Sequence, residues 1–204
     1  MSTKSYRIPA AEQLYELEIK RSKHIAYATR ASSKDEAEAY IREIREQHPQ
    51  ANHVCWAYIA GAPGTTVTSM SDDGEPSGTA GMPMLKVLQY SGLGEIVVAV
   101  VRYFGGIKLG TGGLQRAYSD SVTGVLALLP TREFVSRTEL SLTYDYAQDG
   151  AISQLLQSFN IDNLESDYGE QITVTLAVAD DQMESLKAQL TNICSGQIRI
   201  DKSK

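Results

Sequence analysis

The sequence predicts an α+β protein of two domains, and three observations lead to this prediction. Alternating apolar runs, which are typical of strands, are mixed along the chain with segments of helical periodicity. The charge is uneven, because residues 1–135 carry 14 basic and 14 acidic side chains whereas residues 136–204 carry 5 and 11. The segment PTRE at 130–133 lies close to this change and is interpreted as a linker. We therefore expect a first domain over residues 1–133 and a second over residues 134–204.

The first domain is expected to begin with a hairpin followed by a helix. LYELEIK (14–20) alternates apolar and polar side chains, and HIAYATRA (24–31) is a second extended run. The polar residues 21–23 between them are predicted to form the turn. Ser33 and Glu36 then have the spacing of a capping box, which predicts the start of an amphipathic helix.

The rest of the first domain is predicted to alternate between strands and helices. HVCWAYIAG and TTVTSM have the composition of strands, and MPMLKVLQYSG that of a short helix. EIVVAVVRYFGG is nearly continuous in apolar residues, which predicts a central strand. A helix that opens on glycines follows and ends before a proline. In chain order these five elements are expected at 53–61, 65–70, 82–92, 95–106 and 110–129.

The second domain is predicted to have the order βαββαβ. Such an order is typical of a ferredoxin-like sandwich of about 70 residues. The second helix is expected to begin after Asp180 as its N-cap and to end at Gly196. The strands are expected at 138–146, near 161–168, at 171–179 and at 197–200, and the first helix at 152–159.

Composition limits the classes of function. No run of 18 apolar residues exists and no signal segment opens the chain, so we expect a soluble, cytoplasmic protein without a membrane partner. Cys55 and Cys194 stand apart in apolar contexts, which favours buried thiols over a disulfide. The acidic second domain would repel phosphate backbones, so a nucleic-acid surface would need a local basic patch on the first domain.

The segment RYFGGIKLGTGGLQR (102–116) carries the strongest signal for a binding site. Two aromatic residues end a predicted strand, glycines that allow positive φ follow, and a predicted helix begins after them. Unpaired N–H groups at a helix N-terminus bind anions, and Lys108 and Arg116 would add positive charge. The order of residues is neither a Walker P-loop nor a dinucleotide fingerprint. The alternative is that the glycines serve only a tight turn and close packing, and both interpretations stay open.

The segment SDDGEPSGTAG (71–81) is a second candidate binding segment, and it is acidic where the first is basic. Asp72, Asp73 or Glu75 would supply oxygen ligands to Mg²⁺ together with a substrate phosphate, although the EF-hand pattern is missing. A structured recognition loop without metal and a solvated loop are the alternatives. An ion pair between Asp72 or Glu75 and Arg102 or Lys108 would explain both segments without a ligand.

Together, SDDGEPSGTAGMPM and VVRYFGGIKLGTGGLQRAY resemble the signature of the IMPACT family, in the form of its bacterial two-domain members. The resemblance covers residues 18–130, and the rest is similar to the small domain that bacterial members append. It implies a first domain like domain IV of elongation factor G, a fold shared with GHMP kinases, and a second like domain V. That pairing implies a connection to RNA or the ribosome. Eukaryotic relatives inhibit activation of the amino-acid-starvation kinase and carry an additional RWD domain, so we do not transfer that role.

The residues and the resemblance give one expected function and one alternative. We expect a non-catalytic accessory protein that binds RNA or the ribosome, with no cofactor and with a protein partner for the acidic domain as a further option. The alternative is a phosphate- or nucleotide-handling enzyme with a Mg²⁺ site near the glycine-rich loop. The resemblance supplies no catalytic residues. The candidate binding residues are Asp72, Asp73, Glu75, Ser77, Thr79, Arg102, Tyr103, Lys108, Gly110, Thr111, Gly112, Gly113 and Arg116.

Overall fold

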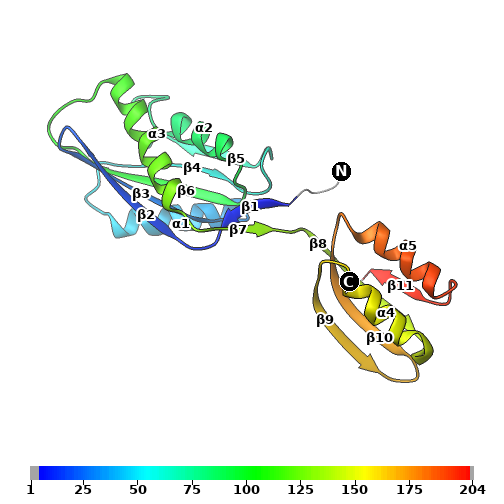
Figure 1. The fold of residues 1–204 in the computed structure, drawn as a ribbon. Helices are drawn as coiled ribbons and strands as arrows, with labels where there is room; N and C mark the ends of the chain where they lie inside the picture. Colours follow the sequence, from blue (N-terminus) through cyan, green and yellow to red (C-terminus); the bar gives the residue numbers. More distant parts are fainter. Residues whose placement is uncertain (1–4, 203–204) are drawn as a thin grey trace. The chain divides into compact units, whose positions relative to one another are not determined.

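The computed structural model describes residues 5–202, and the chain divides into two compact units (Figure 1). The first unit covers Tyr6–Phe134, and the second begins at Val135. Both units combine helices with β-sheets, as the α+β prediction requires. Each unit has its own buried apolar core, so each is described by itself.

An antiparallel sheet of five strands forms the framework of the first unit. Its central strand pairs on both sides, and every residue from Ile96 to Arg102 is buried. The continuous apolar run predicted this position, because a strand covered on both faces has no polar side. Across the sheet the strands are β2 (Gln13–Ile19), β3 (Ser22–Arg30), β6 (Ile96–Tyr103), β4 (His53–Ile59) and β5 (Thr68–Ser71).

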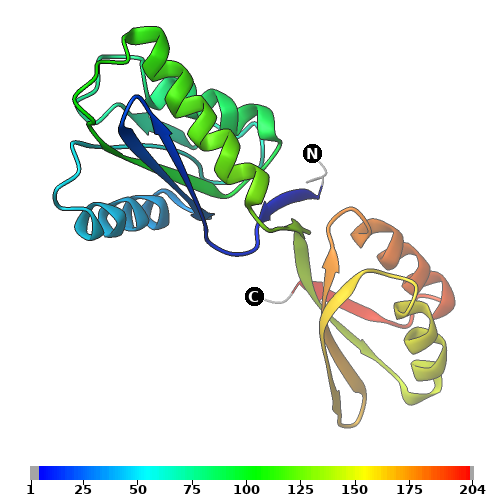
Figure 2. The ribbon, with the colours of Figure 1, turned by 60° about the vertical axis from the view of Figure 1, so that its left-hand side comes forward.

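Helices cover both faces of this sheet (Figure 2). α2 (Gly81–Ser91) and α3 (Thr111–Leu128) pack on one face, and α1 (Lys34–Gln47) packs on the other. Alternate side chains of β6 pack against the helices on the two faces of the sheet. Val98 and Val100 contact α2 and α3, whereas Ala99 and Val101 face α1. Ser33 Oγ accepts a hydrogen bond from the backbone N–H of Glu36, so the predicted capping residue is confirmed.

Two local predictions for the first unit are wrong. The hairpin turn is formed by Lys20 and Arg21, with φ of 48° and 64°, and not by residues 21–23. Positive φ at both central residues matches the right-handed twist of the flanking strands. The segment 130–133 is not a linker, because β7 (Thr131–Phe134) pairs antiparallel with β1 (Tyr6–Pro9). That pairing joins distant parts of the chain and has no local signal in the sequence.

The second unit has the predicted βαββαβ order. Its sheet is antiparallel with the strand order β11-β8-β10-β9, and α4 and α5 pack on the same apolar core (Figure 1). A short 3₁₀ turn, Tyr146–Gln148, precedes α4. The elements are β8 (Arg137–Tyr144), α4 (Asp149–Leu156), β9 (Ile161–Tyr168), β10 (Ile172–Ala179), α5 (Met183–Ile193) and β11 (Arg199–Lys202).

The predicted N-cap of the last helix is a further correction. α5 begins at Met183 with Gln182 in the capping position, whereas Asp180 accepts hydrogen bonds from the hydroxyls of Ser136 and Thr138. These two hydrogen bonds connect the end of β10 to the start of β8. Both cysteines are free and buried, as predicted. No helix in residues 5–202 is long and apolar enough to cross a membrane.

Candidate functional site

Three side chains form a row across the central strands of the first unit. Arg102 of β6 lies directly opposite His24 of β3 on one side and His53 of β4 on the other. Directly opposite residues of antiparallel strands point to the same face, so all three lie on the face that α2 and α3 cover. His24 and Arg102 are buried, and His53 is partly exposed. The sheet thus places one permanent cation and two imidazoles in a line.

Glu75 of the acidic loop neutralises this row. Its Oε1 accepts a hydrogen bond of 2.6 Å from Arg102 and one of 2.8 Å from the Tyr118 hydroxyl of α3. His53 Nε2 lies 3.9 Å from the same oxygen. Arg102 also donates to Ser22 Oγ at 3.4 Å, and its guanidinium lies over the Phe104 ring. The ion pair expected between the two motifs is therefore present, with Glu75 and Arg102 as its members.

The ion pair forms one wall of an open cavity of about 480 Å³. The acidic loop contributes Glu75 and Pro76, and the strand ends contribute Asn52, His53, Arg102 and Phe104. The glycine-rich segment completes the lining with Lys108, Leu109, Gly110, Thr111 and Leu114. Both motifs singled out in the sequence therefore meet at one cavity, although a buried ion pair already joins them.

The N-terminus of α3 opens at this cavity. Gly110 occupies the capping position with a φ of 74°, a backbone conformation that favours glycine, and no side chain caps the helix. The first backbone N–H within α3 to find an intrahelical acceptor belongs to Leu114, which donates to the Gly110 carbonyl. The N–H groups of the preceding turn and the helix dipole therefore favour an anion at this end of α3.

Asp72 has a structural role beside the cavity. Its carboxylate accepts backbone hydrogen bonds from Gly78, Ala80 and Gly81 at 2.7 to 2.9 Å, and so caps the start of α2. Burial by itself would raise the pKa of Asp72, but the three N–H donors together lower it below its ordinary value. The carboxylate is therefore held in its ionised form by the protein itself.

Asp73 is also bound by protein donors. Its carboxylate accepts from the backbone N–H of Val54 at 2.6 Å and pairs with Arg45 of α1 at 2.8 Å. Its carbonyl oxygen lies 2.8 Å from His53 Nδ1. That contact requires a proton on Nδ1, which leaves Nε2 to face Glu75. A cation bound by Asp72, Asp73 or Glu75 would have to displace these contacts, and no cluster of three His, Cys, Asp or Glu within residues 5–202 has the arrangement of a metal site.

Several other predicted site residues lie away from the cavity. Tyr103 points to the opposite face, where its hydroxyl lies 2.8 Å from His48 Nδ1. Arg116 is largely exposed, and its Nε lies 3.7 Å from Oδ2 of Asp120, one turn further along α3. Thr79 is buried and donates to the Pro76 carbonyl, which shapes the acidic loop. Gly112 and Gly113 are not part of the cavity lining, although they belong to the first turn of α3 that opens at the cavity, and Ser77 is exposed on the acidic loop.

Six residues of the cavity wall were not among the predicted site residues, and three of them carry aromatic or polar side chains. Phe104, and not Tyr103, is the aromatic residue that lines the cavity, with 45% of its surface exposed. Asn52 accepts a hydrogen bond of 2.8 Å from the backbone N–H of Phe104 and so fixes its position. His53 opens a predicted strand, so a correct register between the strands 53–61 and 95–106 would have placed it beside Arg102.

Behind the cavity lies a group of buried, electrically neutral side chains. Burial, and after it the nearby Arg102 charge, lower the pKa of His24 to about 4. Neither ring nitrogen of His24 has a hydrogen-bond partner of standard geometry among the described residues. Burial also raises the pKa of the Cys55 thiol and of the Tyr118 hydroxyl. Cys55 is therefore a protonated, unreactive thiol at neutral pH.

Comparison with known proteins identifies the family. Residues 20–126 match the model of the Impact N-terminal domain, and residues 142–197 match a domain of unknown function, DUF1949. An IMPACT family member of Haemophilus influenzae is 40% identical over 96% of this chain and 95% of its own length. The IMPACT family member YigZ of Escherichia coli is 39% identical over 96% of this chain and 97% of its own. A crystal structure of a hypothetical protein is 37% identical, covers 98% of both chains and gives a TM-score of 0.70. The chain belongs to the IMPACT family.

Proposed function

We propose that this protein is a cytoplasmic, non-catalytic accessory factor of translation that binds RNA, alone or on the ribosome, at the cavity of the first unit. The proposal includes the likeness of the two units to domains IV and V of elongation factor G that the family resemblance implies. The observation that carries it is the uncapped N-terminus of α3, which opens into a cavity beside Lys108 and the exposed ring of Phe104. A phosphate at the helix end and a base on the ring would use both features.

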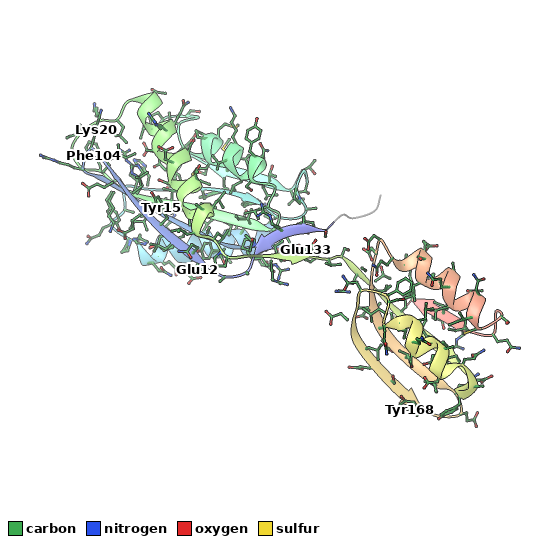
Figure 3. All side chains as sticks on the ribbon, in the orientation of Figure 1. Glu12, Tyr15, Lys20, Phe104, Glu133 and Tyr168 are labelled. Atoms are coloured by element: carbon green, nitrogen blue, oxygen red, sulfur yellow. The ribbon has the colours of Figure 1, made fainter. Side chains whose placement is uncertain are left out.

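Further positive charge lies next to this surface. A Cβ on Gly105 would lie 2.0 Å from the Arg21 backbone, so the β2–β3 turn packs directly against the segment that follows β6. The exposed side chains of Lys20 and Arg21 therefore belong to the same end of the unit as Phe104 (Figure 3). Together with Lys108, these residues supply the local basic patch that a neutral domain needs for phosphate contacts.

The row formed by Arg102, His24 and His53 does not supply that attraction. Arg102 is already neutralised by Glu75, and His24 is uncharged at neutral pH. We therefore assign phosphate attraction to the helix end and the exposed basic residues, and a positioning role to the buried ion pair. In this role Arg102 holds the Phe104 ring, while Glu75 connects the sheet to α3 through Tyr118.

The alternative function, a Mg²⁺-dependent phosphate-handling enzyme, would use the same helix end. It would also need carboxylates free to hold the metal, and Asp72, Asp73 and Glu75 are each engaged by protein donors. A titration with ATP and Mg²⁺ separates the two functions. Tight binding that depends on the metal would favour the enzyme, whereas competition between RNA and ATP at equal affinity with or without Mg²⁺ favours a phosphate surface.

The test is binding of a short fluorescent single-stranded RNA by anisotropy, together with sedimentation of the protein with ribosomes. Phe104→Ala is expected to weaken RNA binding roughly tenfold through lost stacking. Lys108→Glu is expected to weaken it and to make the dependence of log affinity on log salt shallower by about one phosphate contact. Lys34→Glu, an exposed charge reversal on α1, is the matched control and should leave binding unchanged.

Two results would reject the proposed function. One is that wild type neither binds the RNA nor sediments with ribosomes at low salt. The other is that binding occurs but Phe104→Ala, Lys108→Glu and Lys34→Glu all bind like wild type, since the contact would then lie elsewhere.

A further inference from the structure

The second unit contains a separate cavity of about 410 Å³ between α4 and β9. Its walls are mostly apolar and aromatic. Leu156 and Phe159 contribute from α4 and the turn after it, and Leu164 and Tyr168 contribute from β9. Val174 of β10 lines the floor. This cavity therefore continues the apolar core of the unit outward to its surface.

The edge strand β9 presents part of this lining to solvent. In the pairing of β9 with β10, Glu165 lies opposite Thr175 and Asp162 opposite Ala177, so two residues of β9 oppose Leu176 alone. Such a bulge bends the strand and redirects its side chains. Leu164 lies in the bulge and is 52% exposed, and Tyr168 is 63% exposed. Two large apolar side chains are thus displayed at the rim of a formed cavity.

The unit that contains this cavity is strongly acidic in sequence. Between Arg137 and Lys187 the sequence contains no lysine, arginine or histidine, and this stretch builds α4, β9 and β10. The ten carboxylates of the stretch are Glu139, Asp145, Asp149, Asp162, Glu165, Asp167, Glu170, Asp180, Asp181 and Glu184. Asp149 lies on the cavity wall itself, where it accepts a hydrogen bond from the Tyr144 hydroxyl. Glu165 and Asp167 alternate with the cavity-lining residues of β9 and point to the other face of the sheet. The net charge of the unit is negative, and its field attracts cationic partners.

We propose that this cavity is a docking site for a basic peptide segment of a partner protein, which inserts one large apolar side chain between Leu164 and Tyr168. The negative charge of the unit, with Asp149 on the cavity wall, favours lysine and arginine in the segment, and the apolar lining binds its anchor. The edge of β9 would also pair with an extended segment through its backbone.

Charge argues against the other occupants. A second copy of this chain would bring Glu165 and Asp167 against the same residues of its partner, and like charges directly opposite each other destabilise a strand pair. Nucleic acid would meet the same repulsion. The proposal concerns the second unit and stands independently of the RNA function assigned to the first.

The test uses the full chain and three matched fluorescent peptides, read by anisotropy. The first peptide alternates lysine and leucine, the second replaces lysine by glutamate, and the third replaces leucine by serine. We expect the first to bind most tightly, and salt to weaken its binding because the attraction between the peptide and the acidic unit is electrostatic. Leu164→Arg and Tyr168→Ser should each weaken its binding about tenfold.

A matched control excludes a general effect of charge. Ile193→Arg adds the same charge to the same acidic unit at a 43% exposed position on α5, outside the cavity, and should change peptide binding less than twofold. All four proteins are checked for unchanged thermal midpoints, which their exposed positions favour.

Three results would overturn the proposal. They are equal binding of all three peptides, or no binding of the lysine–leucine peptide, or an equal loss in Leu164→Arg and Ile193→Arg. Sedimentation velocity adds a fourth: a wild-type dimer that Leu164→Arg dissociates would assign the cavity to a second copy of the chain.

Discussion

Glu75 and Arg102 form an ion pair of 2.6 Å in which the two side chains are only 3% and 6% exposed. The carboxylate comes from a loop between β5 and α2, and the guanidinium comes from the end of the central strand. Tyr118 binds the same oxygen, so one carboxylate joins a loop, the sheet and α3. This arrangement explains why the two motifs occur together even before any ligand is considered.

Removing one member of this pair should destabilise the first unit strongly. Glu75→Gln leaves the Arg102 charge buried without a counter-charge, and we expect a loss of about 3–5 kcal/mol in the free energy of unfolding. Glu75→Leu combined with Arg102→Met should be more stable than either single change, because no charge then remains buried. Urea denaturation of wild type, Glu75→Leu, Arg102→Met and the double variant forms a double-mutant cycle that measures this coupling. Strictly additive losses in the free energy of unfolding would contradict the prediction.

The Asp72 cap should contribute to stability independently. Asp72→Ala removes the acceptor of three backbone N–H groups at the start of α2, and we expect a loss of about 2 kcal/mol or more. Since the folded protein lowers the Asp72 pKa, wild type should keep this contribution at neutral pH and lose it as pH falls through the lowered value. Thermal unfolding from pH 7 downward checks both points, with Ser77→Ala, an exposed change in the same loop, as control.

His24 should make the protein sensitive to mild acid. Its pKa is about 4 in the folded chain and about 6.5 when unfolded, so the unfolded state binds more protons between these values. Stability is therefore full above the unfolded value and falls by about 2 kcal/mol between pH 7 and pH 5. His24→Leu should remove this part of the pH dependence. Unfolding curves at both pH values that change equally in wild type and variant would contradict the prediction.

Two glycines distinguish packing from ligand contact. Gly105→Ala should destabilise the chain by about 1–3 kcal/mol, because the new methyl group would lie 2.0 Å from the Arg21 backbone. Gly112→Ala should stabilise it by up to about 1 kcal/mol, since no atom lies within 4 Å and the residue is helical.

RNA binding by Gly112→Ala tests whether the absence of a side chain at this position serves a ligand. If the backbone at the start of α3 approaches a phosphate closely, Gly112→Ala should weaken RNA binding although the fold is more stable. If RNA binding of Gly112→Ala equals that of wild type, glycine is not required at this position for a ligand.

The amino-acid sequence by itself determined most of the helices and strands, although not the pair of β1 and β7. The continuous apolar run of β6, the alternation of β10 and the capping serine of α1 are local patterns, so they can be recognised from neighbouring residues alone. The same patterns gave the βαββαβ order of the second unit. The sequence also singled out the two motifs that meet at the cavity.

Only the tertiary structure decided which residues of those motifs face one another. Tyr103 and Phe104 are adjacent aromatic residues, and the sequence does not tell which of them faces the cavity. Because successive side chains of an extended strand point to opposite faces, Tyr103 points toward α1 and Phe104 toward the cavity. Asp72, Asp73 and Glu75 are equally acidic, yet one caps a helix, one pairs with Arg45 and one neutralises Arg102. Strand register and loop closure over long sequence separations set these roles, and neither leaves a local pattern in the chain.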